Sequence, residues 1–200
     1  MKPRAELETR NSRGLEQFCA FLDERRGLNI LDLAAASQST ISFVTGQGHR
    51  LYSEDFMMQL EEYFGEGDFY ENQADPLNAD RFLQATLDFP PGDFDGALVW
   101  DVLENLGPSL LGRVVARLHA ILRPGASLLA LFHAEEPKAP PPPPASYRIQ
   151  DRRTILMIPR GARHPIQFFN NRNLEKLFQD FQSVKLFLTR EALREVIVKR

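Results

Sequence analysis

Five polar side chains lie at or near the carboxyl ends of predicted strands and could take part in binding or proton transfer: Asp32, Glu54, Asp55, Asp101 and His133. Carboxylates accept hydrogen bonds from ammonium and hydroxyl groups, and an imidazole titrates near neutral pH. Asp101 and His133, with Glu104 as a third candidate, could therefore act as general bases for an acceptor that must lose a proton. In open α/β sheets, ligands bind at the carboxyl ends of the strands. The sequence thus predicts one site built from the ends of several strands.

Other kinds of site find little support. Cys19 is the only cysteine, so neither a disulfide nor a thiolate metal cluster can form within the chain. The spacing of His, Cys and carboxylate residues gives no ligand set, so no metal is expected. No apolar run approaches the ~20 residues that a membrane helix needs, and residues 1–14 lack the apolar core of a signal peptide. These features predict a protein of the reducing cytoplasm without membrane association.

The elements that must hold these side chains alternate along the chain. Helices are predicted over residues 13–26, 39–47, 55–64, 108–122 and from Asn171 or Asn173 to about Phe181. Strands are predicted over residues 28–34, 50–53, 95–100, 127–132, 184–188 and 195–199, with a weaker strand over 82–87 and a pair formed by 147–149 and 154–158. This alternation predicts a parallel sheet between helical layers, and the closing strand pair predicts an antiparallel edge.

The chain is expected to form a single domain over residues 1–200. Residues 1–12 are polar and are expected to be a flexible N-terminus, and residues 65–80 are expected to be a loop with room for one helical turn. Residues 135–163, which contain five consecutive prolines, are expected to be a Pro-rich loop or lid. The prolines indicate a stiff spacer, with a ligand for a polyproline-binding domain as the alternative.

The order of the motifs resembles that of class I S-adenosylmethionine-dependent methyltransferases. NILDLAAAS stands where the family has its first strand and glycine-rich turn, and RLYSEDF stands where its second strand ends in an acidic residue. FDGALVWDVLENL resembles the fourth motif, LRPGASLLALF resembles the following strand, and residues 168–200 resemble the terminal helix and strand hairpin. The resemblance implies a Rossmann-like α/β fold: a mostly parallel seven-stranded sheet with an antiparallel C-terminal strand and helices on both faces.

By this resemblance the cofactor would be S-adenosylmethionine. Asp32 would hold its methionine ammonium group, and Glu54 or Asp55 would accept hydrogen bonds from both ribose hydroxyls. Trp100 and Asp101 would line the cofactor through backbone and side-chain contacts.

The first loop departs from the family's glycine pattern. Ala34, Ala36 and Gln38 occupy the three glycine positions, where glycine tolerates positive φ and lets backbone amides approach a ligand. An alanine in the left-handed region costs about 1 kcal/mol, whereas the longer Gln38 side chain is expected to occupy space near the cofactor or to reshape the turn. The family's acidic residue after the third strand is also missing, since residues 82–85 are Phe-Leu-Gln-Ala.

Two functions from different classes therefore stay open. The chain is either a methyltransferase acting on a small-molecule or protein acceptor, or an inactive methyltransferase fold that serves as a binding or scaffolding module. An unrelated nucleotide-binding α/β protein is a third alternative.

The distribution of charge bears on partners. Residues 54–104 contain 14 acidic residues and one basic residue, Arg81, whereas residues 145–200 contain 12 basic and five acidic residues. Either the basic C-terminal surface or the Pro-rich loop could contact a protein partner, although two differently charged solvated surfaces explain the pattern as well. The acidic stretch beside the predicted site argues against nucleic acid as a partner.

Overall fold

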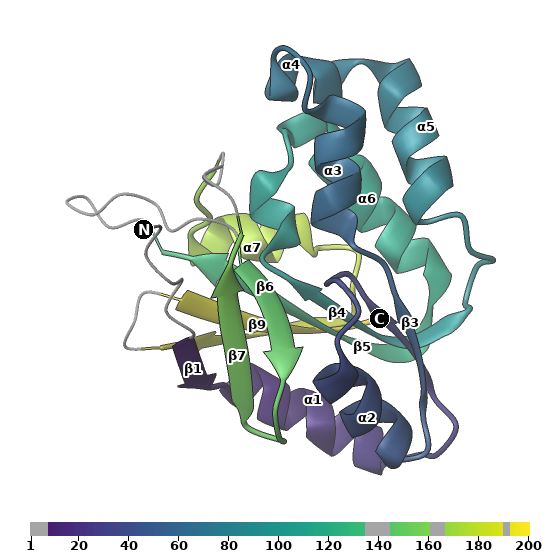
Figure 1. Cartoon of the computed structure of the whole chain (residues 1–200), viewed down its shortest axis with the longest axis vertical. Coiled ribbons are helices and arrows are strands. Elements are labelled where there is room, and N and C mark those ends of the chain that lie inside the picture. The colour runs from purple at the N-terminus through teal and green to yellow at the C-terminus, as the bar shows by residue number, and fades with distance from the viewer. Residues whose placement is uncertain (1–7, 135–144, 161–166, 190–192) are drawn as a thin grey trace, which may run out of the picture.

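Six strands form the main sheet, in the order β3-β2-β4-β5-β9-β8 (Figure 1). The computed structural model describes residues 8–134, 145–160, 167–189 and 193–200. The strands are β2 (Asn29–Asp32), β3 (Arg50–Ser53), β4 (Phe94–Trp100), β5 (Leu122–His133), β8 (Ser183–Leu188) and β9 (Leu193–Lys199). The first four in spatial order pair in parallel, and β9 pairs antiparallel with both β5 and β8. The described residues thus give the predicted mixed α/β sheet with six strands rather than the expected seven.

Helices cover both faces of this sheet, and a smaller sheet shares one of the faces (Figure 1). One face packs against α3 (Phe56–Phe64), α4 (Phe69–Ala74), α5 (Pro76–Thr86), α6 (Pro108–Ile121) and α7 (Asn171–Leu177). The other packs against α1 (Arg13–Asp23), α2 (Gln38–Gly46) and the antiparallel sheet of β1 (Glu8–Asn11), β7 (Thr154–Pro159) and β6 (Ala145–Ile149). Within the described ranges, none of these helices has the length and apolar character needed to cross a membrane.

Residues 82–87 form the end of α5 and its C-cap rather than the predicted strand. Asp75 caps this helix, and Pro76 takes its first position. Three residues at helical spacing fill its buried face: Ala79, Phe82 and Thr86. The Asp-Pro start signal therefore outweighs the short apolar stretch that suggested a strand. As a consequence, β3 forms the edge of the main sheet in the described part of the chain.

The two segments expected to flank or interrupt the domain supply the small sheet. Residues 8–11 of the expected flexible N-terminus are β1, and residues 1–7 lie outside the described part. Within the expected loop over 135–163, β6 and β7 form the predicted strand pair, in which Tyr147 lies opposite Met157. The proline run itself lies outside the described residues.

Two helix starts also differ from prediction because of local capping. The expected loop over 65–80 contains α4, which Asp68 caps by accepting two backbone amide hydrogen bonds. Asn170, rather than Asn171 or Asn173, caps α7, because its side chain accepts a hydrogen bond from the Asn173 amide at 2.8 Å.

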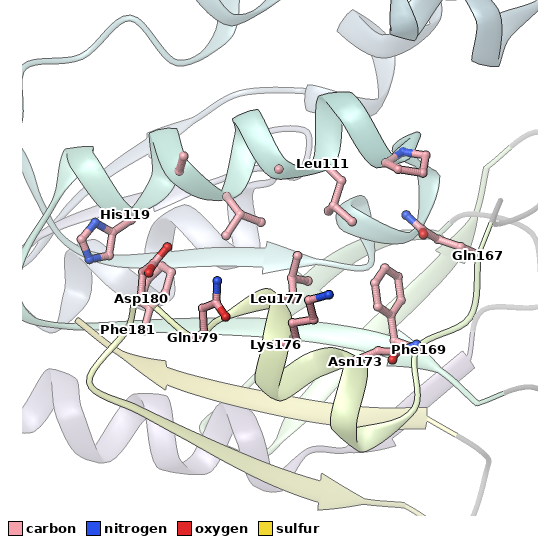
Figure 2. A pocket seen from close by; sticks show the side chains of 14 residues that line it. Leu111, His119, Gln167, Phe169, Asn173, Lys176, Leu177, Gln179, Asp180 and Phe181 are labelled. Atoms are coloured by element: carbon pink, nitrogen blue, oxygen red, sulfur yellow. The ribbon is translucent and has the colours of Figure 1, made fainter.

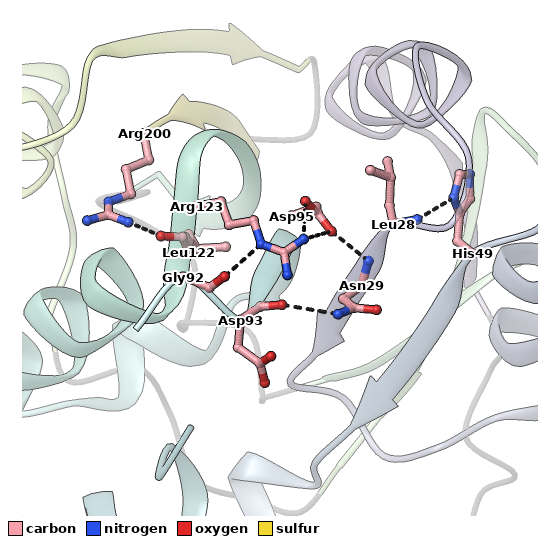
Figure 3. Close-up of polar contacts among 9 residues, drawn as sticks. All are labelled: Leu28, Asn29, His49, Gly92, Asp93, Asp95, Leu122, Arg123 and Arg200. Carbon is pink, nitrogen blue, oxygen red and sulfur yellow. Dashed lines mark hydrogen bonds and ion pairs between the residues drawn. The ribbon is translucent and has the colours of Figure 1, made fainter. Parts of the chain in front are cut away.

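The amino ends of β2 and β4 are tied together by polar contacts (Figure 3). Arg123 donates to both carboxylate oxygens of Asp95, at 2.8 and 2.9 Å, and to the Gly92 carbonyl at 2.7 Å. Asp95 also accepts a hydrogen bond from the Asn29 amide at 2.9 Å. Structural hydrogen bonds thus occupy this end of the sheet, opposite the end where the predicted site residues lie.

Candidate functional site

The predicted site residues lie at the carboxyl ends of the four parallel strands. This end of the main sheet is the carboxyl edge. Asp32 ends β2, where it is in register with Ser53 of β3 and Leu98 of β4. Trp100 ends β4 and His133 ends β5. The predicted convergence of strand ends is therefore present in the structure.

Asp32 is a buried carboxylate with one oxygen occupied and one oxygen left over. Its side chain accepts hydrogen bonds on Oδ1 from the Trp100 indole at 2.7 Å and from the Ala34 amide at 3.0 Å. Its Oδ2 is buried and has no hydrogen-bond partner among the described residues. Burial raises the pKa of Asp32 to about 7, although both hydrogen bonds act in the opposite direction. The site therefore holds an acceptor atom that lacks a donor.

The loop that connects β2 to α2 contains no glycine. None of its alanines has positive φ, since Trp100 is the only non-glycine residue in the described ranges with that conformation. Ser37 instead starts α2 as its N-cap, with extended backbone and a side chain that accepts from the Thr40 amide. The expected strain of alanine in the left-handed region is therefore absent.

The three residues at the family's glycine positions differ in where they lie. Ala34 is buried beside Asp32, whereas Ala36 and Gln38 are exposed. The Gln38 amide donates to the Ser42 hydroxyl at 2.9 Å, one turn further along α2. The Gln38 side chain thus lies along its own helix, and its expected place near the cofactor stays a prediction.

The two acidic residues after β3 have different surroundings. Asp55 caps α3 and receives two hydrogen bonds from the Arg160 guanidinium, at 2.7 and 2.5 Å. Burial would raise the pKa of Asp55, but the Arg160 and Met58 hydrogen bonds hold it below its usual value. Burial and the neighbouring Asp55 charge raise the pKa of Glu54, whose backbone amide donates to the Asp32 carbonyl at 2.8 Å. Asp55 is thus engaged by Arg160, which directly follows β7, while the Glu54 backbone lies next to Asp32.

Trp100 links the two sheets at this edge. Its backbone φ of 57° lies in the left-handed region, which is rare for a bulky residue. Its ring stacks on Tyr147 of β6, with centroids 5.1 Å apart and planes at 4°. The indole N–H of the same ring donates to Asp32. The ring therefore lies between β2 and the small sheet, and the strained backbone of Trp100 keeps it there.

Asp101 is a second buried carboxylate with an unpaired oxygen. Its Oδ2 accepts hydrogen bonds from the Tyr147 hydroxyl at 2.7 Å and the Ala145 amide at 3.4 Å. Its Oδ1 is buried without a partner in the described part of the chain. Burial raises the pKa of Asp101 to about 6, against the effect of the Tyr147 hydrogen bond. A carboxylate with this pKa is ionised at neutral pH and can still accept a proton.

Glu104 and His133 form a buried pair next to Asp101. The His133 ring nitrogen Nδ1 lies 2.7 Å from Glu104 Oε2, and the His133 amide donates to Glu104 Oε1 at 2.5 Å. Burial raises the pKa of Glu104 well above its usual value and lowers the pKa of His133. Both shifts favour a pair in which Glu104 and His133 are each uncharged.

Two residues of this edge were not found from the sequence: Tyr147 and Arg160. Tyr147 lies on β6 and Arg160 directly follows β7, and each reaches a carboxylate that comes just after a strand of the main sheet. The sequence predicted the strand pair that carries them, but no local pattern shows that this pair folds back over the strand ends. Among the described residues, no group of three or more His, Cys, Asp or Glu side chains is placed to hold a metal ion.

A separate groove lies between α6 and α7 on the other face of the sheet (Figure 2). Its volume is about 850 Å³, with an apolar floor that includes Leu111, Val115 and Phe169 and a polar rim that includes Lys176 and Asp180. The lining contains none of the predicted site residues. The groove is therefore distinct from the carboxyl edge.

Comparison with known proteins gives a match in fold. No family model matches the sequence, and no curated protein matches it. A Sulfolobus solfataricus protein proposed to be a type 11 methyltransferase is 13% identical, with a TM-score of 0.52 over 96% of this chain and 94% of that one. A Burkholderia thailandensis 1,6-didemethyltoxoflavin-N1-methyltransferase, solved with S-adenosylhomocysteine, is 16% identical, with a TM-score of 0.48 over 94% and 78% of the two chains.

The first of these likenesses concerns nearly the whole length of both chains. It confirms the predicted resemblance at the level of architecture: the chain has the α/β fold of methyltransferases. At this identity, a shared fold does not assign a substrate or a reaction.

Proposed function

We propose that this chain is an S-adenosylmethionine-dependent methyltransferase that acts on a small-molecule or protein acceptor. The observation that carries the proposal is the buried Oδ2 of Asp32, which lacks a donor among the described residues. A buried polar atom left without a partner is costly, and an ammonium group would supply the missing donor. Asp32 also lies next to the point between β2 and β4 where the strand order reverses, the usual ligand position in such sheets.

The neighbouring residues fit the rest of the cofactor. Glu54 lies beside Asp32 and is the better acceptor for the ribose hydroxyls, because Asp55 is already engaged by Arg160. Trp100 fixes the orientation of the Asp32 carboxylate through its indole N–H. The oxygen facing away from Trp100 is the one that would bind the ammonium group.

The chain would contribute orientation and proton transfer to the reaction. S-adenosylmethionine, when bound, supplies a methyl group already activated by its sulfonium. Tyr147 holds one oxygen of Asp101, which leaves Oδ1 to accept a proton from a hydroxyl or amine of the acceptor. With a pKa of about 6, Asp101 is ionised at neutral pH and can perform this step.

An inactive binding module is the alternative, and one arrangement favours it. Trp100 and Tyr147 are both 1% exposed, and their stacked rings cover the strand ends beside Asp32. If this stack cannot move, the space for the cofactor is closed. In that case the basic C-terminal surface or the Pro-rich loop would be the contact region for a protein partner.

Calorimetric titration with S-adenosylmethionine and S-adenosylhomocysteine separates these functions. We expect micromolar binding of at least one of them, weakened about tenfold or more in Asp32→Asn, since that variant loses a charge worth roughly 1.4 kcal/mol of binding or more. Asp68→Asn is the matched control, because Asp68 is an exposed helix cap outside the site. Absence of heat with both ligands at millimolar concentration would refute the methyltransferase and leave the binding module.

A further inference from the structure

We propose that two copies of this chain associate through the outer edge of β3, antiparallel to each other about a two-fold axis at Tyr52. The two six-stranded sheets would then join into one continuous sheet. This pairing is argued from the sheet edge and not from cofactor binding. It uses Glu54, which the proposed function assigns to the ribose hydroxyls, so it is tested on the chain without cofactor.

The outer edge of β3 presents backbone groups that the main sheet does not use. The Arg50 amide donates to the Leu28 carbonyl and the Glu54 amide donates to the Asp32 carbonyl, both at 2.8 Å, so these residues face β2. Backbone groups alternate in direction along a strand, so those of Leu51 and Ser53 point away from β2. In the part of the chain that the structure describes, β3 pairs with β2 alone.

A two-fold axis at Tyr52 gives these groups partners in a regular antiparallel register. Leu51 of one copy lies opposite Ser53 of the second copy, and each pair can exchange both of its backbone hydrogen bonds. Two such pairs form because of the symmetry, one on either side of the axis. The two Tyr52 residues face each other in the closely spaced pair between them.

The charges at the two ends of β3 are complementary in this arrangement. Arg50 of one copy lies opposite Glu54 of the second copy, and the symmetry repeats the pair, whereas a parallel pair in the same register would place Arg50 opposite Arg50. Charged residues on an edge strand usually oppose pairing, but opposite charges directly across from each other stabilise it. β8, the other edge of the main sheet, carries Lys185 as its only charged residue, so a two-fold pair there would contain no pair of opposite charges.

Tyr52 has the exposure that such an interface requires. It is 51% exposed, although its ring is held edge-on against Phe89 with centroids 4.9 Å apart. Arg50, Tyr52 and Glu54 alternate with the outward backbone positions and share one face of the strand. The interface therefore combines four backbone hydrogen bonds, two ion pairs and a central pair of aromatic rings.

Sedimentation velocity tests the pairing without cofactor, over loadings from about 10 to about 500 µM, because interfaces under about 1,200 Å² are usually weak. We expect a concentration-dependent dimer. Each of R50E and E54R should weaken association about tenfold, since two attractive pairs become repulsive. An equimolar mixture of R50E and E54R should associate as a heterodimer as strongly as the unchanged chain, because every opposed pair is again of opposite sign.

Recovery in the mixture also shows that neither variant has lost its fold. K185E, on the exposed face of β8, is the control and should leave the dimer unchanged. A monomer at every loading, or a dimer that both single variants leave intact, would overturn the proposal. A dimer that K185E disrupts and R50E does not would place the interface at the opposite edge and would also overturn it. Because the readout is association and not ligand binding, failure of this proposal is distinct from failure of the proposed reaction.

Discussion

Replacing Asp32 with Asn should change how the stability of the protein depends on pH. The pKa of Asp32 rises from 3.8 to about 7 on folding, because the carboxylate is buried. Below about pH 4 the group is protonated in both states, and the stability is fully present. Between pH 4 and 7 the unfolded state loses its proton first, so the free energy of unfolding falls. A shift of about 3 pKa units corresponds to a loss of about 4 kcal/mol, complete above pH 7.

The Asn variant removes this dependence and adds a constant cost. The Oδ1 of the Asn side chain can still accept hydrogen bonds from Trp100 and Ala34. Its NH2 group takes the place of the unpaired Oδ2 and has no acceptor, which lowers the free energy of unfolding by about 1–3 kcal/mol. We therefore expect Asp32→Asn to be less stable than the unchanged chain at pH 4 and more stable at pH 8. Urea denaturation at both pH values, followed by far-UV circular dichroism and by the fluorescence of Trp100, the only tryptophan, measures the difference.

The control for this experiment is a carboxylate with the opposite shift. Asp151 is exposed, and hydrogen bonds from the Arg153 and Thr154 amides lower its pKa. Asp151→Asn should therefore lower stability more at pH 8 than at acidic pH. If the stability difference between the Asp32 variant and the unchanged chain were the same at pH 4 and pH 8, the argument that Asp32 is buried as an uncompensated acid would be refuted.

Three further predictions concern the carboxylates Asp101 and Asp55. Tyr147→Phe removes the main hydrogen-bond donor to Asp101 and should lower the free energy of unfolding by about 1–3 kcal/mol at pH 8. The loss should be smaller at pH 5, where Asp101 is protonated. Equal losses at both pH values in urea denaturation would contradict this prediction. A double-mutant cycle of Arg160→Ala and Asp55→Ala should give a coupling of about 1 kcal/mol, since the pair is only partly buried, and additive losses would show that the ion pair contributes nothing. If the proposed reaction holds, methyl transfer at saturating cofactor should rise with pH through about 6 as Asp101 ionises and level off above, and a rate that falls over this range would exclude Asp101 as the base.

The strands of the main sheet could be predicted because their signals are local. Residues 50–53 were assigned as observed, and the buried runs that end at Asp32 and Trp100 were recognised from apolar continuity. The predicted strand over 82–87 was wrong, since the helix that replaces it begins at Pro76, several residues upstream. Local sequence signals thus identify a helix or strand best when the residue that starts it lies directly before its apolar run.

The candidate site could be predicted only in part, for a related reason. Strand ends place Asp32, Trp100 and Asp101 together, and the parallel sheet dictates that convergence. The roles of Tyr147 and Arg160 depend on how the small sheet lies against the main sheet, which no period in the sequence encodes. The orientation of Gln38 was not predictable from the glycine pattern, because a serine cap, not a glycine turn, ends the first loop.

The position of β9 has a consequence for synthesis of the chain. β9 follows β8 in sequence but lies between β5 and β8 in the sheet. While a ribosome is still making residues 193–199, the apolar strand β5 therefore has an open edge over Ser127–His133, the stretch that β9 later covers. Open apolar edges recruit other strands, so nascent chains on one message would be prone to pair with each other. The synthesis of β9 thus ends the period in which the open edge of β5 needs protection.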